Sequence, residues 1–157
     1  MARVEIRNVS LNYHTLAGEV RAVEDISLTI EDQEFVAIVG QSGCGKSTLL
    51  SLISGLLRPA RGSVFIDQEE VQGPCRRVGY MLQNDYLFEW RTILDNALLG
   101  LEIRREKTPE AVAEVKAMLK AYGLGGFEQY YPAQLSGGMR QRVALTRTLA
   151  TGPDVLL

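Results

Sequence analysis

The sequence predicts an α/β fold in which a strand-rich first part is followed by an inserted helical subdomain and then by a return to a buried strand. Three observations predict this order. A short apolar run at residues 35–39 leads through a glycine-rich turn into a helical pattern. Residues 1–31 alternate apolar and polar positions, as antiparallel strands do. Residues 92–150 carry helical patterns without a strand, and a new apolar run follows at residues 155–157.

The composition is that of an ordinary soluble domain. The 157 residues suffice for one domain with a substantial core, and 46% of them are hydrophobic. No apolar run approaches the roughly 18 residues of a membrane span, and the N-terminus lacks the apolar core of a secretion signal. Cys44 and Cys75 match no metal-ligand spacing, which favours a reduced cytosolic protein. The net charge of −2 gives no support to a nucleic-acid partner.

The first elements are read from their periodicity. Half-buried strands are expected at residues 4–11 and 26–30, with a hairpin loop at residues 12–19 between them. The run at residues 35–39 is apolar on both faces, which is typical of a central strand in a covered parallel sheet.

Beyond the glycine-rich turn, the pattern indicates two short strands and then helices. The strands are expected at residues 64–66 and 78–82. Thr108 is expected to cap a helix that ends before Gly123. A further helix is expected over residues 136–150.

The glycine-rich turn reads GQSGCGKST and matches G-x-x-x-x-G-K-[ST], the P-loop pattern. Glycines allow successive backbone N–H groups to face one concavity, and the following helix adds partial positive charge there. Lys46 would reach the β- and γ-phosphates, and the Ser47 hydroxyl would bind Mg²⁺. The sequence therefore predicts a site for a nucleoside triphosphate. Its expected contacts are Gly40, Gln41, Ser42, Gly43, Cys44, Gly45, Lys46, Ser47 and Thr48.

A second candidate anion site opens the helix expected at residues 136–150. Ser136 offers a hydroxyl, and Gly137 and Gly138 offer backbone N–H groups at a helix N-terminus. Taken alone, this tripeptide is a weak signal, because serine and glycine are common at N-caps. It gains meaning from the P-loop earlier in the same chain.

The two motifs together resemble the ATP-binding subunits of ABC transporters, and the resemblance covers the whole chain. Residues 40–48 match the P-loop of that family, residues 135–141 its LSGGQ-type signature, and Gln83 its glutamine loop. Tyr13 lies where the family has an aromatic residue that stacks on adenine. The resemblance implies a P-loop NTPase fold with a RecA-like core, an N-terminal antiparallel β layer and an inserted helical subdomain.

The resemblance also implies a single ATP-binding domain that is incomplete at its C-terminus. Residues 1–89 would form the β layer and the P-loop core, and residues 90–150 the helical subdomain with the signature. Residues 151–157 would begin the strand that carries the family's acidic motif, so the catalytic carboxylates are expected after Leu157. His14, the single histidine, lies in the first hairpin and is not the family's switch histidine. We therefore expect this chain to bind ATP without multi-turnover hydrolysis, which a phosphate-release assay would check.

The family mechanism requires two such domains, arranged head to tail. ATP and Mg²⁺ on the P-loop of one domain would be covered by the signature of the other, and Gln83 would sense the γ-phosphate and Mg²⁺. The implied partners are a second ATP-binding subunit, integral membrane permease subunits and a solute-binding protein, with no nucleic acid. The implied location is peripheral, on the cytoplasmic face of the membrane. The expected contacts to the partner's ATP are Leu135, Ser136, Gly137, Gly138 and Met139, the last standing where the family most often has Gln.

Alternative interpretations remain open for several features. Without the resemblance, Tyr13 is a loop aromatic that packs locally, and Gln83 is a polar strand end. The aromatic cluster at residues 86–90 either packs the helical part or forms a groove for a permease helix. Among ABC transporters, importers of nitrate, sulfonates, taurine or thiamine precursors have the motif sequences that this chain most resembles. The alternative functions are a soluble ABC-type ATPase of DNA repair or chromosome organisation, and a P-loop kinase acting on a small molecule.

Overall fold

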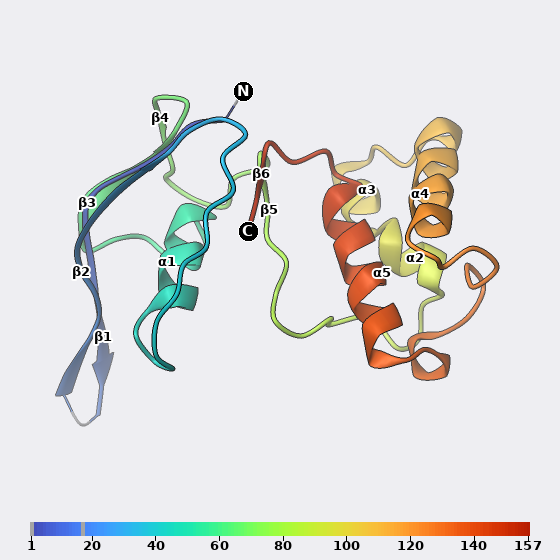
Figure 1. Cartoon of the computed structure of the whole chain (residues 1–157), viewed down its shortest axis with the longest axis horizontal. Helices are drawn as coiled ribbons and strands as arrows, with labels where there is room; N and C mark the ends of the chain where they lie inside the picture. Colours follow the sequence, from blue (N-terminus) through green and yellow to red (C-terminus); the bar gives the residue numbers. More distant parts are fainter. Residues whose placement is uncertain (1, 17) are drawn as a thin grey trace. The chain divides into compact units, whose positions relative to one another are not determined.

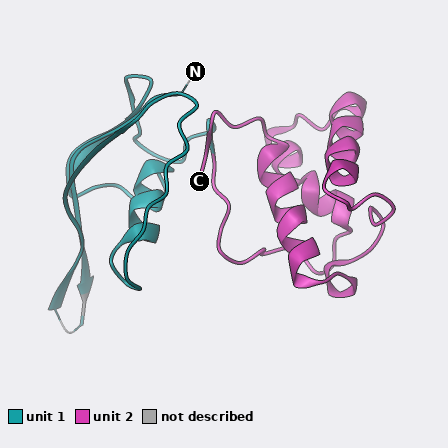
Figure 2. Ribbon diagram, viewed as in Figure 1, with its two compact units in different colours: residues 1–78, 157 teal, residues 79–156 magenta. Residues whose placement is uncertain are grey.

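The computed structural model describes residues 2–16 and 18–157 (Figure 1). It divides into two compact units (Figure 2). Unit 1 runs up to Val78 and also contains Leu157, and unit 2 is Gly79–Leu156. Each unit has its own elements and its own core, and each is described by itself.

Unit 1 contains a four-stranded antiparallel sheet, which confirms the predicted β layer. Its strands are β1 (Val4–Thr15), β2 (Gly18–Ile30), β3 (Arg61–Ile66) and β4 (Glu69–Glu70), in the order β2-β1-β3-β4. The loop expected at residues 12–19 is mostly strand, because the pairing of β1 with β2 continues as far as Thr15 and Gly18. Two residues, 16 and 17, then connect the strands, and Ala17 lies outside the described residues.

One face of this sheet packs against the P-loop helix. The helix α1 (Lys46–Ile53) forms where the helical pattern after the glycine-rich turn predicted it, and it contacts β2 and β3. Buried apolar side chains from the sheet and from α1 form the core of unit 1. The most fully buried of them are Val4, Val9, Leu52, Ile53, Val64 and Ile66.

The central strand predicted at residues 35–39 is not formed. Residues 34–40 are neither strand nor helix, and Phe35 and Val39 are 95% and 87% exposed. A central parallel strand needs a hydrogen-bonded neighbour on each side, and no described strand pairs with this run. The run predicted at residues 78–82 is likewise reduced to a two-residue strand, β5 (Val78–Gly79), which pairs with β6 (Val155–Leu156).

Between Thr92 and Ala150, all of which the structure describes, unit 2 contains helices joined by turns and no strand, as predicted. It contains α2 (Ile93–Ala97), α3 (Leu99–Arg104), α4 (Pro109–Ala121), a 3₁₀ turn η1 (Pro132–Gln134) and α5 (Gly137–Leu149). The expected cap of α4 is present, because the Thr108 hydroxyl accepts from the N–H of Ala111 at 3.2 Å. Gly123 follows α4 with φ 73°, a conformation that suits glycine at a helix end.

The core of unit 2 lies where α5 packs on α2 and α4 (Figure 1). The predicted apolar face of α4 supplies Val115 and Leu119, which are almost completely buried, and Val112, which packs beside them. Burying one such side chain contributes about 1.5–3 kcal/mol. Because α5 packs against these buried side chains, its position within unit 2 is fixed.

Candidate functional site

The P-loop, residues 40–48, lies in unit 1 between the run at residues 35–39 and helix α1. Its last glycine, Gly45, is the N-cap of α1 and has φ 94°. A Cβ at this position would lie 2.1 Å from the carbonyl oxygen of Ala22 in β2. Only glycine allows this approach, so Gly45 fixes where the loop meets the sheet.

The Lys46 ammonium closes over the loop. Its Nζ donates to the carbonyl oxygens of Gly40 at 2.9 Å and Gln41 at 2.6 Å, and it lies 3.5 Å from Cys44 Sγ. Among the described residues no carboxylate forms an ion pair with Lys46. The charge is held by neutral dipoles alone, and an anionic phosphate would be a stronger partner.

The start of α1 offers backbone donors at the same place. The first intrahelical hydrogen bond joins the N–H of Leu49 to the carbonyl of Gly45 at 2.9 Å, so the three preceding N–H groups have no partner within the helix. The N-cap makes no side-chain hydrogen bond, and no acidic residue occupies the first turn. Ser47 is exposed in this turn, where its hydroxyl is free to ligate Mg²⁺ beside a bound phosphate. The donor set thus fits the phosphates of ATP with Mg²⁺.

Tyr13, the residue that the resemblance assigns to adenine stacking, lies next to this helix. Its hydroxyl is 3.3 Å from Thr48 Oγ1, and its side chain is 41% exposed. The structure therefore brings Tyr13 to the P-loop helix from near the end of β1. Its role in stacking on adenine stays a prediction.

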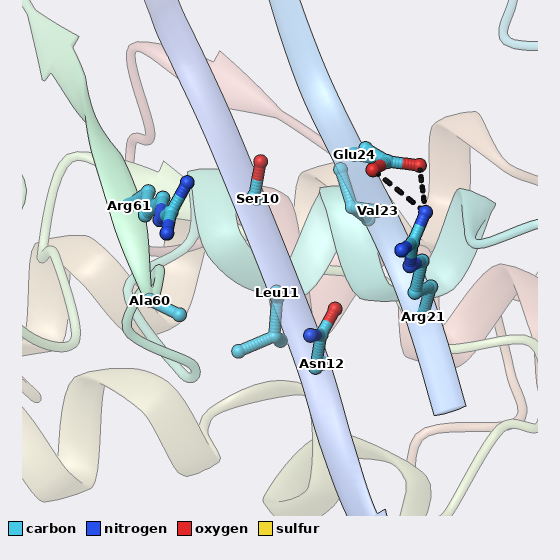
Figure 3. Close-up of a pocket in the computed structure, with 8 residues that line it drawn as sticks. All are labelled: Ser10, Leu11, Asn12, Arg21, Val23, Glu24, Ala60 and Arg61. Carbon is cyan, nitrogen blue, oxygen red and sulfur yellow. Dashed lines mark hydrogen bonds and ion pairs between the residues drawn. The ribbon is translucent and has the colours of Figure 1, made fainter. Parts of the chain in front are cut away.

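Two hollows flank these elements in unit 1. One, of about 220 Å³, lies behind the P-loop and is lined by Gly45 and Lys46 together with residues 22–24 of β2. The other, of about 240 Å³, lies where β3 begins beside β1, and Arg21 and Glu24 form an ion pair at its edge (Figure 3). No residue of the P-loop lines the second hollow.

The signature residues lie at the start of α5 in unit 2, apart from the P-loop in the chain, and form the second candidate anion site. Ser136 is the N-cap of α5, and its Oγ accepts from the N–H of Met139 at 3.3 Å. Gly137 and Gly138 are exposed, and a Cβ on either would meet nothing within 4 Å. Leu135 is buried, and Met139 packs against the core. The residue that departs from the family pattern thus has a packing role here, and both glycines are exposed to solvent.

Gln83 lies in the glutamine loop (residues 83–86), also in unit 2. Its side chain is exposed, whereas its carbonyl accepts from Gln141 Nε2 at 3.1 Å. Arg140 Nε donates to Asp85 Oδ2 at 3.0 Å. The loop is therefore held to α5 close to the signature, so Gln83 and residues 135–141 come together in one unit.

Sequence reasoning missed Arg147, two turns further along α5. Its guanidinium donates to the carbonyls of Asp85 and Tyr86. Burial lowers the pKa of Arg147 from its ordinary value, and the Asp85 charge opposes this. No local signal in the sequence pointed to this contact, because its partners lie more than 60 residues away.

The aromatic cluster at residues 86–90 consists of exposed or half-buried rings and one buried aliphatic side chain, Leu87. Trp90 is 75% exposed and stacks on Phe88 with ring centroids 4.9 Å apart, and Tyr86 is 59% exposed. Leu87 belongs to the core of unit 2. Packing accounts for the buried member, and the exposed rings leave the permease-groove interpretation open.

Over residues 2–16 and 18–157, no helix has the length and apolar character to cross a membrane. Within the same described ranges, no three His, Cys, Asp or Glu side chains gather as ligands for a metal ion. The two cysteines, Cys44 and Cys75, are free thiols.

Comparison with known proteins gives consistent matches. The family model described as "ABC transporter" matches residues 23–157. An uncharacterized ABC transporter ATP-binding protein of Bacillus subtilis is 45% identical over 157 residues, which are 100% of this chain and 60% of that protein. A taurine import ATP-binding protein of Jannaschia sp. is 39% identical over 158 residues, covering 100% of this chain and 59% of that protein. An aliphatic sulfonates import ATP-binding protein of Bacillus cereus is 38% identical over 154 residues, covering 98% and 60%.

Solved structures agree with these relatives. The dimeric structure of MJ0796, a bacterial ABC transporter cassette, has a TM-score of 0.86 at 32% identity and covers 98% of this chain and 72% of its own. A post-hydrolysis dimer of MJ0796 bound to ADP and Pi has a TM-score of 0.82 at 31% identity, with the same coverage. These matches confirm the predicted P-loop NTPase fold. This chain spans 60% or less of the length of the curated relatives named here.

Proposed function

Because the chain belongs to the ABC transporter family, we propose that it is the nucleotide-binding part of an importer's ATP-binding subunit. The observation that carries this proposal is the convergence of donors in unit 1. Lys46 and the first N–H groups of α1 meet at one loop, and within the described part of the chain no carboxylate pairs with Lys46 or occupies the first turn of α1. This arrangement suits the β- and γ-phosphates of a nucleoside triphosphate.

Mg²⁺ and the adenine ring would be held by neighbouring side chains. The exposed Ser47 hydroxyl would ligate Mg²⁺ beside the phosphates, and Gln83 would sense the γ-phosphate and Mg²⁺. Tyr13, which already contacts Thr48, would stack on the adenine ring.

The signature surface supports a head-to-tail pair of subunits. Ser136, Gly137 and Gly138 are exposed at the N-terminus of α5, where an ATP phosphate on a second subunit would bind. The relatives of known structure are dimeric cassettes. The proposed partners are thus a second ATP-binding subunit, membrane permease subunits and a solute-binding protein. The proposed location is the cytoplasmic face of the membrane.

Hydrolysis and transport are proposed for the whole polypeptide rather than for these 157 residues, since the chain spans only part of its relatives. ATP binding and hydrolysis in the closed dimer would drive the permease. The named import relatives act on taurine and aliphatic sulfonates, and a solute of this class is proposed here. A small-molecule P-loop kinase would leave the signature surface without this use. A soluble ABC-type ATPase of DNA repair would carry a long coiled coil between the P-loop and the signature, whereas the longest helix described in this interval is α4, of 13 residues.

Nucleotide binding can be tested with a matched pair of lysine variants. Lys46→Ala removes the P-loop ammonium, whereas Lys116→Ala removes an exposed lysine of α4. Hydrogen bonds to charged groups contribute about 1.5–3 kcal/mol, so Lys46→Ala should weaken MgATP binding about ten- to hundredfold. Equilibrium dialysis with labelled ATP measures the affinity. Equal affinities for both variants and the parent chain would contradict the proposal.

A further inference from the structure

The glutamine loop is held in place by side chains of α5. The loop lies outside helix and strand. Its Gln83 carbonyl accepts from Gln141 Nε2 at 3.1 Å. Arg147 donates from Nη2 to the Asp85 carbonyl at 2.6 Å and from Nη1 to the Tyr86 carbonyl at 2.9 Å. Three carbonyls of this loop are therefore bound by two side chains of one helix.

The same helix also binds the one carboxylate of the loop and holds a strained residue. Arg140 Nε donates to Asp85 Oδ2 at 3.0 Å. Arg140 and Arg147 are seven residues apart, which places them two turns apart on one face of α5. Tyr86 has φ 42°, a conformation that is costly for a residue other than glycine. The bidentate contact of Arg147 spans this residue, so it keeps the loop in a conformation that the free chain would rarely adopt.

The helix α5 thus connects two candidate functional elements, the signature residues and the glutamine loop. Its N-terminus carries the exposed donors of Ser136, Gly137 and Gly138, and its side chains hold the glutamine loop. Val143 and Ala144, between the two contact points, are buried in the core. A helix packed in this way moves as one body, so a displacement at its N-terminus carries the bound loop with it.

We propose that Arg147 is a positioning residue for Gln83. When a phosphate binds at the N-terminus of α5, the helix would shift and move the glutamine loop with it. The inference rests on the proposed function, because it assigns ATP phosphates to both ends of this connection. The inference goes further by naming Arg147 as the side chain that couples the N-terminus of α5 to the glutamine loop. Coupling of this kind is reciprocal, so loosening the loop must also alter the response to nucleotide at the helix.

A matched pair of arginine variants on α5 tests the positioning role. Arg147→Gln removes both contacts to the loop. Arg142→Gln removes a guanidinium that also donates to carbonyls, those of Tyr122 and Gly138, away from the loop. Amide hydrogen exchange, resolved by residue, measures the opening of each segment. The loop is monitored through the two amides that follow it, hereafter the loop amides: the N–H of Leu87, which donates to Asp85 Oδ1 at 3.3 Å, and that of Phe88, which donates to Asn96 Oδ1 at 2.8 Å. Arg147→Gln should raise exchange of these loop amides about tenfold or more, whereas Arg142→Gln should leave them unchanged.

Rescue separates positioning from general destabilisation. Arg147→Lys should restore part of the protection, because one ammonium can still donate to a carbonyl. Millimolar guanidinium added to Arg147→Ala should restore it as well. Gln141→Ala provides a second variant at a partly exposed position, and it should speed exchange near Gln83 without unfolding unit 2.

The nucleotide response completes the test. MgATP, but not MgADP, should protect the loop amides in the parent chain and in Arg142→Gln, and should fail to do so in Arg147→Gln. Protection of the P-loop amides, read in the same samples, reports separately on the proposed function. The inference is overturned if the loop exchanges alike in Arg147→Gln, Gln141→Ala and the parent chain. It is also overturned if MgATP protects the loop equally in Arg147→Gln and Arg142→Gln.

Discussion

Asn96 should be one of the strongest single determinants of stability in unit 2. Its side chain is fully buried, and its Oδ1 accepts from the N–H of Phe88 at 2.8 Å. Its Nδ2 donates to the carbonyls of Phe88, Arg91 and Thr92 at 3.0 to 3.1 Å. These contacts close the turn that carries the aromatic cluster into α2. Replacing Asn96 by Ala leaves all of these backbone groups without their partner.

The expected cost follows from the number of bonds. An amide has two N–H donors and one carbonyl acceptor, so the four contacts represent about three hydrogen bonds in energetic terms. At about 1 kcal/mol for each, Asn96→Ala should lower the free energy of unfolding of unit 2 by about 3 kcal/mol. Urea unfolding, followed by the fluorescence of the single tryptophan, Trp90, measures this value next to the affected turn.

Two further variants sharpen the test. Asn84→Ala is the matched control, because Asn84 is exposed and makes one contact of 3.4 Å to the Tyr86 hydroxyl, so its loss should change stability by less than about 0.5 kcal/mol. Asn96→Asp keeps the acceptor but turns a carboxylate oxygen towards three carbonyls, so at neutral pH it should be less stable than Asn96→Ala. The reasoning fails if Asn96→Ala and Asn84→Ala unfold at the same urea concentration, or if Asn96→Asp is the more stable of the two Asn96 variants.

Two other outcomes follow from the contacts. Gly45→Ala should abolish MgATP binding in the dialysis assay, because the added Cβ would lie 2.1 Å from the Ala22 carbonyl oxygen. Gly138→Ala should leave the melting temperature of unit 2 the same or higher, because a Cβ at this position meets no atom within 4 Å. The hydrogen bond from Arg91 lowers the pKa of Glu102, so this contact stabilises unit 2 above the unfolded-state pKa and is lost as the pH falls through the lowered, folded-state pKa. Glu102→Gln should therefore flatten the decline in stability between neutral and acidic pH, and an unchanged profile would contradict the assignment.

The features predicted well are those that neighbouring residues determine. The caps at Thr108 and Ser136 are set by contacts three residues apart, and the P-loop by its glycines and the helix that follows. Such local signals can be recognised in the sequence without knowledge of the rest of the fold. The role of residues 35–39 could not be read in this way, because a strand exists only where another strand pairs with it.

The contacts that sequence reasoning missed are long-range and made by side chains. Arg147 reaches carbonyls 61 and 62 residues away, and the other arginines and lysines of the helices carry the same kind of N–H donors. Asn96 has no distinctive pattern around it, and only its burial shows that its amide closes a turn. Carbonyl acceptors occur at every residue, so the sequence cannot indicate which of them an arginine or an asparagine will bind.

The two candidate anion sites differ in a way that favours joint use by two subunits. Both are helix N-termini without an acidic first turn. The P-loop adds Lys46, whereas the described arginines near the signature end of α5 are engaged within unit 2. Arg140 donates to Asp85 and to the carbonyl of Leu135, and Arg142 donates to the carbonyls of Gly138 and Tyr122. Neutral donors alone hold a free anion weakly in water, but they add selectivity around a phosphate already bound by a lysine. The signature is therefore suited to complete a nucleotide site whose cation comes from another chain.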